Sequence, residues 1–221
     1  MATPDAGRHL DPSRLTPADR AEWAALRTPR RRLDWASSRA LLGAAPAANP
    51  DDCASSLSHS HGFAVLARAP RSVSVGVDVE WLAPRDFRSM ARTAYSALEA
   101  DELESVEDPA VLSGRFYEFW TLKEAFAKAL RLPLADALRQ CCFAGAGRTA
   151  ASAPSVPTTR HWRATVFAPR PQLRLAAVFV ADTAGALAAV PVTVEWPPEH
   201  PVDWPVVRRH SGRGIEGAVP C

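Results

Sequence analysis

The feature that most constrains the fold is the uninterrupted segment from Phe116 to Leu130, which contains neither glycine nor proline. Pro133 follows shortly afterwards and predicts the end of a helix there. Apolar side chains recur at helical spacing along the segment, so one face is expected to pack on a core. These core positions are Phe119, Leu122, Phe126 and Leu130.

A neighbouring face of the same helix carries Trp120, Glu124 and Lys128, which are four residues apart and therefore lie one above the other. A carboxylate and an ammonium group on a rigid element beside the core can serve a reaction. They can equally form an ordinary surface ion pair. The helix alone leaves both interpretations open.

The most regular stretch of the chain runs from Ser72 to Glu80, where valines alternate with small or acidic residues. This period of two predicts a strand with one packed face and with Asp78 and Glu80 together on the other. Two neighbouring carboxylates repel each other unless a cation lies close by. The pair indicates either a solvated sheet edge or a site for magnesium, which prefers oxygen ligands.

Basic residues gather upstream of this strand. Arg30–Arg32 precede a second helical candidate, 34–42, which carries Arg39. Arginine runs usually form a solvated face, but guanidinium groups also bind phosphate in a bidentate way. His59 and His61 lead into a plausible buried strand, 62–67, and they are either incidental or a pair of ligands.

The remaining chain predicts a mixture of helices and strands. Ser96 followed by Glu99 has the form of a capping box and predicts a helix through Leu103. A short helix is expected before it, and a loop or short extended segment is expected at 132–134. Proline and glycine residues separate three strand-like runs, 162–167, 173–180 and 187–195, which are expected to form an antiparallel meander. Residues 197–221 are expected to form a flexible tail.

Composition narrows the class of protein. The 221 residues are 47% hydrophobic and 23% charged, as in a soluble globular protein of one sizeable domain or two small ones. A formal net charge of +2 gives no argument for binding nucleic acid. The absence of a long apolar run or secretory signal, and four cysteines without a metal or disulfide spacing, favour a cytoplasmic protein without membrane contact.

Two segments resemble motifs of the 4′-phosphopantetheinyl transferases. Residues 75–80 resemble the motif G-[IV]-D-[IVL]-E, and residues 119–128 resemble W-[ST]-x-K-E-[AS]-x-x-K. Their separation is similar to that of the surfactin-synthetase-activating type. Further likenesses to that type are Ser58-His59-Ser60, the segment Tyr95–Glu99, and Arg39 before Leu41-Leu42-Gly43.

The resemblance implies an α+β fold of two similar halves related by a pseudo-twofold axis. It places a boundary near Arg71, which gives an N-terminal half, 1–71, a C-terminal half, 72–196, and the tail, 197–221. The stretch between Leu42 and Ser58 is short, so the first half is expected to be trimmed.

The family moves phosphopantetheine from coenzyme A to a serine of an acyl or peptidyl carrier protein and releases adenosine 3′,5′-bisphosphate. The resemblance implies a monomer that uses magnesium, or manganese as an alternative. Carried over by position, the resemblance implies that the metal ligands are Asp78, Glu80 and Glu124. It implies Glu124 as the general base, Lys128 at the leaving group, and Glu99 near the metal water. The implied contacts to coenzyme A are Arg31, Arg39, His59, Lys123 and Lys128.

Two alternatives remain at this point. A non-catalytic relative would bind coenzyme A or dock on a synthase, but it would have no need of Glu124 and Lys128 together. A different magnesium-dependent phosphotransferase would be expected to carry a glycine-rich phosphate loop, and the sequence offers no such motif in its favour.

Overall fold

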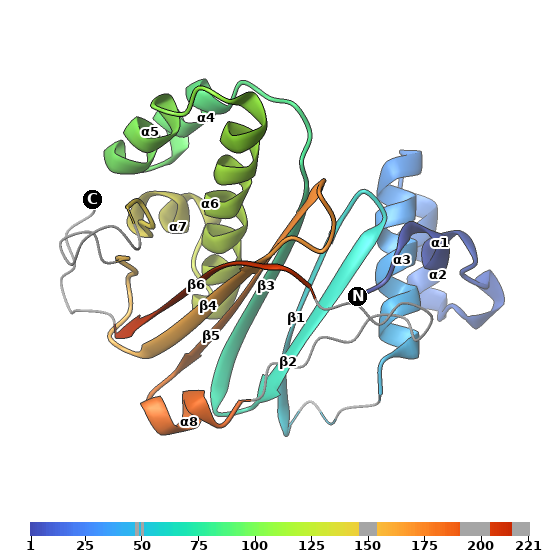
Figure 1. Ribbon diagram of the computed structural model, residues 1–221. Helices are drawn as coiled ribbons and strands as arrows, with labels where there is room; N and C mark the ends of the chain where they lie inside the picture. Colours follow the sequence, from blue (N-terminus) through green and yellow to red (C-terminus); the bar gives the residue numbers. More distant parts are fainter. Residues whose placement is uncertain (47–48, 50, 146–153, 191–203, 214–221) are drawn as a thin grey trace.

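The structure is a computed structural model that describes residues 1–46, 49, 51–145, 154–190 and 204–213. Two sheets and eight α-helices occur in this part of the chain, which confirms the expected α+β class. In Figure 1 the long helix α6 lies across one face of the larger sheet, with α4, α5 and α7 near it, and the N-terminal helices lie beyond the smaller sheet.

The larger sheet has the strand order β3-β5-β4-β6, and all its neighbouring strands are antiparallel. Asp78 of β3 lies opposite Ala176 of β5, and Glu80 lies opposite Arg174. The strands are β3 (Val73–Trp81), β4 (His161–Phe167), β5 (Leu173–Ala181) and β6 (Val206–Arg213).

The prediction for the C-terminal part of the chain was wrong in two places. The helix α8 (Ala184–Ala188) occupies the start of the expected third strand, and residues 191–195 of that strand lie outside the described part. Strand β6 instead forms inside the expected flexible tail and pairs with β4. Only His210 of β6 is buried, so backbone pairing rather than an alternating apolar pattern makes this strand.

The smaller sheet is the hairpin of β1 (Cys53–Ser60) and β2 (Phe63–Pro70). Its two-residue turn has positive φ at His61 and Gly62, as a type I′ turn requires. The sequence had indicated only a turn and a strand start before residue 62. The proposed boundary near Arg71 falls in the turn between β2 and β3, and the division into domains stays a prediction.

The N-terminal helices are α1 (Pro4–Arg8), α2 (Pro17–Ala25) and α3 (Pro29–Ala44), with a 3₁₀ turn η1 (Pro12–Arg14) between the first two. Thr28 caps α3 and accepts a hydrogen bond from the Arg31 amide, so the arginine run lies in the first turn of this helix. The helix therefore begins earlier than the sequence pattern suggested.

The helices beside the larger sheet are α4 (Phe87–Ala94), α5 (Ala97–Glu104), α6 (Pro109–Leu130) and α7 (Leu134–Gln140). Asp108 caps α6, and Pro109 occupies its first turn, so α6 also begins before the predicted segment. The helix α7 replaces the predicted loop after residue 132. No helix in the described residues is long and apolar enough to span a bilayer.

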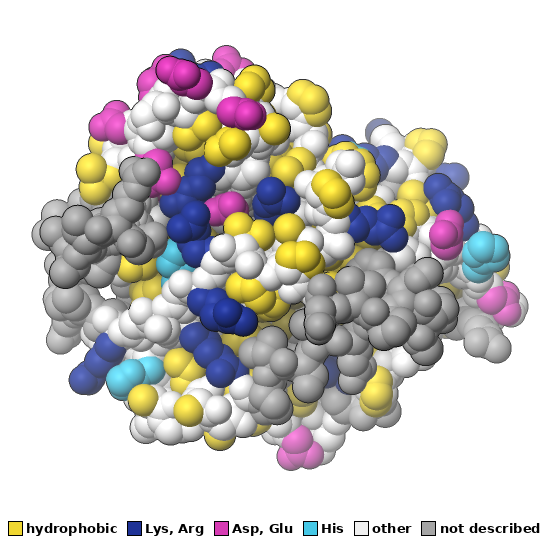
Figure 2. Space-filling view, in the orientation of Figure 1, with side chains coloured by type: hydrophobic (Ala, Val, Ile, Leu, Met, Phe, Trp, Pro, Cys, Tyr) yellow, Lys and Arg dark blue, Asp and Glu magenta, His cyan; other side chains and the backbone are white. Residues whose placement is uncertain are grey.

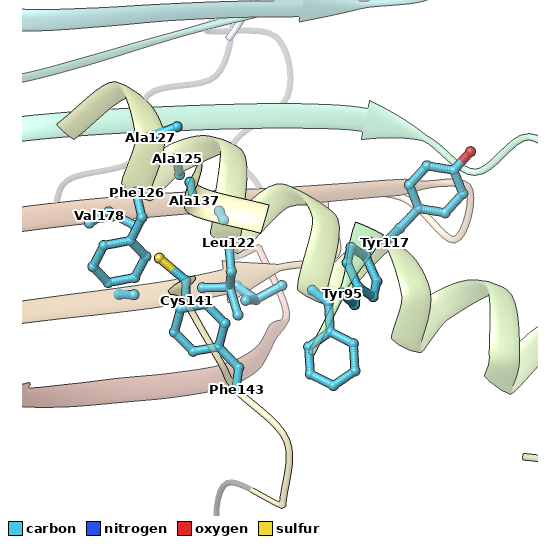
Figure 3. Close-up of a cluster of buried hydrophobic side chains, with 14 of the residues drawn as sticks. Tyr95, Tyr117, Leu122, Ala125, Phe126, Ala127, Ala137, Cys141, Phe143 and Val178 are labelled. Carbon is cyan, nitrogen blue, oxygen red and sulfur yellow. The ribbon is translucent and has the colours of Figure 1, made fainter. Parts of the chain in front are cut away.

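Buried aromatic side chains fix α6 on the sheet. Phe126 lies 5.4 Å from Phe143 and 5.3 Å from Trp162 of β4, measured between ring centroids. Figure 3 shows Phe126, Phe143 and Cys141 gathered beneath the helix. A second cluster joins valines of β3 to Phe63 and Val65 of β2, so apolar packing continues across the turn at residue 71. The helix bearing Glu124 is thus held rigidly over the strand bearing Asp78.

Candidate active site

Three carboxylates meet between β3 and α6. Asp78 and Glu80 share a face of β3 because alternate residues of a strand point the same way. Glu124 reaches them from α6, and one oxygen atom of each of the three groups lies within 4.8 Å of the others. The structure therefore brings together the three acidic residues that the sequence singled out.

Gly76 makes this close approach possible. A Cβ atom at residue 76 would lie 1.9 Å from the backbone oxygen of Ala125 and 2.7 Å from the amide nitrogen of Ala129. The backbone of α6 therefore occupies the space that any larger residue would need. The glycine of the strand motif lets Glu124 and Lys128 come within reach of Asp78.

Asp78 is buried and uses one of its two carboxylate oxygens. Its Oδ1 accepts hydrogen bonds from Ser58 Oγ at 2.7 Å and from Lys128 Nζ at 2.8 Å. Its Oδ2 is buried without a hydrogen-bond partner. An unpartnered carboxylate oxygen in the interior is costly, and a bound cation would remove that cost.

Lys128 is the ammonium group of the site. Besides Asp78, its Nζ donates to the Val77 backbone oxygen at 2.9 Å and lies 3.9 Å from Glu124 Oε2. An ammonium group carries three N–H donors, and two are used in these hydrogen bonds. Lys128 therefore ties the strand to the helix and keeps one donor for a further acceptor.

The carboxylates lie in an environment that disfavours their ionised forms. Burial raises the pKa of Asp78, although Lys128 opposes that shift. Burial and the neighbouring Asp78 raise the pKa of Glu80. Burial, followed by the charge of Asp78, raises the pKa of Glu124 to about 8. One lysine does not balance three carboxylates, and the hard oxygen donors fit a divalent cation such as magnesium.

Lys123 is a correction to the sequence interpretation. Its side chain is fully buried, its Nζ lies 2.7 Å from Glu99 Oε2, and it donates to the backbone oxygens of Leu138 and Cys141. Glu99 is fully buried too and accepts from the Ser96 cap. Lys123 is thus a structural partner of Glu99 and has no donor exposed for a phosphate. Glu99 serves the capping box and this buried pair, and its implied place near a metal water stays a prediction.

The other predicted contacts to coenzyme A lie on α3 and β1. Arg39 forms ion pairs with Asp19 at 2.9 Å and Glu22 at 2.8 Å, so two carboxylates already neutralise it. Arg31 and His59 are exposed. Their placement leaves them accessible, but no contact joins them to the carboxylates.

Two arginines near the carboxylates were not among the predicted site residues. Arg30 and Arg85 lie close enough to Glu80 to lower its pKa against the effect of burial. Arg30 belongs to the arginine run, where position alone did not distinguish it from Arg31 or Arg32. Arg85 follows β3 in a loop, and its Nε donates to the Tyr117 hydroxyl at 3.1 Å. A basic residue shortly after an acidic strand motif was the available signal for Arg85.

One known family resembles part of the chain. Residues 74–178 match the model of the 4′-phosphopantetheinyl transferase superfamily. The matched segment runs from β3 into β5 and contains Asp78, Glu80, Glu124 and Lys128. It therefore supports a transferase. No curated protein matches the chain.

Proposed function

We propose that the protein transfers the phosphopantetheine arm of coenzyme A to a serine of an acyl or peptidyl carrier protein. The observation that carries the proposal is the convergence of Asp78, Glu80, Glu124 and Lys128 within a segment that matches the superfamily. The surfactin-synthetase-activating type, a cytoplasmic location and a monomeric state belong to the same proposal.

The proposed metal ligands are Asp78, Glu80 and Glu124. Their oxygen donors, together with the unpartnered buried Oδ2 of Asp78, fit magnesium, with manganese as an alternative. A bound ion would neutralise negative charge that develops on the reacting phosphate. The remaining chemistry falls to side chains of this chain.

Glu124 is the proposed general base. It accepts the proton of the incoming serine hydroxyl, directly or through water, while the serine oxygen forms its bond to phosphorus. The bond from that phosphorus to the oxygen of the departing adenosine 3′,5′-bisphosphate breaks. Lys128 neutralises the leaving phosphate with the N–H that its contacts to Val77 and Asp78 leave available.

Exposed cations are the proposed contacts for the phosphates of coenzyme A. Arg31 and His59 remain in this set, and Arg30 and Arg85 join it because they lie near Glu80. Arg39 stays a candidate, although a phosphate would have to compete with Asp19 and Glu22. Figure 2 shows Lys and Arg side chains spread over the middle of one face, a distribution that would attract an acidic carrier protein.

Mass spectrometry of apo carrier proteins tests the proposal. Incubation with the protein, coenzyme A and magnesium is expected to add the mass of one phosphopantetheine arm to a carrier. Glu124→Gln is expected to remove the transfer, and Glu107→Gln, which changes an exposed glutamate outside the site, is the matched control. A chain that binds coenzyme A but modifies none of several carriers would support the non-catalytic alternative instead.

A further inference from the structure

Three serines of β1 form a ladder against β3. Ser56, Ser58 and Ser60 are alternate residues, so their side chains leave the same side of the strand. Each hydroxyl accepts a hydrogen bond from a β3 amide 21 residues further along the chain. The constant offset indicates that β1 and β3 run parallel. The donors are Val77 to Ser56 at 3.1 Å, Val79 to Ser58 at 3.4 Å and Trp81 to Ser60 at 3.2 Å.

The ladder supplies hydrogen-bond acceptors for the free edge of the larger sheet. β3 is an edge strand of the four-stranded sheet, and its outward amides need acceptors. Serine hydroxyls of β1 supply these acceptors in place of backbone carbonyls. The position of β1 is therefore coupled to the strand that carries Asp78 and Glu80.

Two of the three serines make a second contact. Ser58 Oγ donates to Asp78 Oδ1 at 2.7 Å, and Ser60 Oγ donates to Glu80 Oε2 at 2.9 Å. Ser56 shows no such contact to a carboxylate within the described residues. A hydroxyl has one hydrogen and two lone pairs, so a hydroxyl held by a β3 amide can aim its hydrogen at one carboxylate.

These contacts decide which oxygen atoms stay available. Ser58 and Lys128 both donate to Oδ1 of Asp78, and Oδ2 is left buried without a partner beside Glu80 and Glu124. Loss of the Ser58 hydroxyl would free the carboxylate to rotate away from this orientation.

We infer that Ser58 and Ser60 are positioning residues that set the divalent-cation affinity of the three-carboxylate site. The inference rests on the metal site of the proposed function and deepens it. The segment that matches the superfamily, 74–178, holds the carboxylates themselves, whereas the hydroxyls that orient them come from the N-terminal hairpin. Groups that orient metal ligands typically contribute about 10–100-fold to affinity.

A titration of the metal-free full chain with Mn²⁺, followed by electron paramagnetic resonance, tests this inference. Ser58→Ala is expected to weaken Mn²⁺ binding by about tenfold or more. Ser60→Ala is expected to weaken Mn²⁺ binding less. The Ser60 hydroxyl has a second possible partner, His61 Nδ1 at 3.2 Å, so its hydrogen is not committed to Glu80 alone. Ser56→Ala is the matched control, because it removes a ladder hydrogen bond without touching a carboxylate, and its Mn²⁺ affinity is expected to equal that of the wild type.

Ser58→Thr keeps the hydroxyl and is expected to restore binding. Equal Mn²⁺ affinity in Ser56→Ala and Ser58→Ala, or a wild-type chain without Mn²⁺ binding, would overturn the inference. Thermal unfolding of each variant checks that it is folded, and Ser60→Ala carries the test if Ser58→Ala does not fold. The titration needs neither coenzyme A nor a carrier protein. If the variants show the expected order of Mn²⁺ affinities but the wild-type chain transfers no phosphopantetheine, the inference about Ser58 and Ser60 holds and the proposed function is wrong.

Discussion

Lys128 Nζ lies 2.8 Å from Oδ1 of Asp78, across the gap between α6 and β3. The same ammonium group lies 3.9 Å from Glu124 Oε2. Among the described residues, Lys128 is thus the one cation that forms ion pairs within the group of three carboxylates, and its shorter pair is with Asp78, the most buried of them. The contact links the two sequence motifs. It also places a positive charge of α6 beside the buried carboxylate of Asp78, whose ionised form needs a nearby cation.

Replacing Lys128 tests this link. Lys128→Met is expected to lower kcat more than it raises the KM for coenzyme A, because the lysine acts on the leaving group. It is also expected to cost about 2 kcal/mol of stability without metal, since a charged hydrogen bond to Asp78 is lost. Urea unfolding and transfer kinetics measure the two effects. Lys128→Arg keeps the charge and should retain most of the stability, and an equal loss in both variants would contradict the ion-pair argument.

Replacing Gly76 tests the close approach of helix and strand. Gly76→Ala puts a Cβ atom 1.9 Å from the Ala125 oxygen, so α6 has to shift. The expected cost is about 3 kcal/mol of stability, with weaker divalent-cation binding as Glu124 moves from Asp78. Gly43→Ala is the control, since nothing lies within 4 Å of its added Cβ, and it is expected to stabilise α3 by up to about 1 kcal/mol. Similar effects at both glycines would refute the steric explanation.

Lys123 is expected to matter for stability rather than for phosphate binding. Lys123→Met leaves the buried carboxylate of Glu99 without its cation, which is expected to cost about 3–5 kcal/mol. The double variant Lys123→Met/Glu99→Gln should lose much less than the sum of the single losses. Urea unfolding gives these values, and calorimetry is expected to show unchanged affinity for coenzyme A in folded protein. A large loss of affinity with normal stability would restore the phosphate-binding role.

The buried side chain of His210 is expected to make the folded protein less stable in acid. Burial, with smaller effects of Arg208 and Arg115, lowers its pKa from 6.5 to about 4. Between these values the unfolded chain binds a proton that the folded chain does not, so stability falls as the pH drops from 6.5 towards 4. The free energy of unfolding is expected to fall by about 3 kcal/mol in total over this range, and His210 causes no loss of stability above pH 6.5.

Urea unfolding across this pH range measures the slope. His210→Leu is expected to flatten it, because it removes the buried imidazole. An unaltered slope in His210→Leu would assign the acid sensitivity to another group.

Local pattern was enough for the elements that build the site. The alternation of valines identified β3, and the helical spacing of Phe119, Leu122 and Phe126 identified α6, because each element buries one face. Neither pattern by itself shows that the two elements approach each other. The packing over Gly76 supplies its physical reason.

Other elements depended on partners far away in the chain. β6 carries one buried side chain and forms because β4 offers an unpaired edge, which no local pattern reveals. Lys123 and Lys128 are both lysines on one helix, yet five residues of helical rotation send one into the core and the other to Asp78.

The sequence by itself determined the class of fold, the three carboxylates of the site and Lys128, because strand and helix periodicity and motif spacing are local properties. Only the tertiary structure decided that Lys123 is buried against Glu99 and which hydroxyls orient the carboxylates. Those outcomes depend on packing among β1, β3, α5 and α6, where the distances between side chains, and not their order in the chain, set the hydrogen bonds.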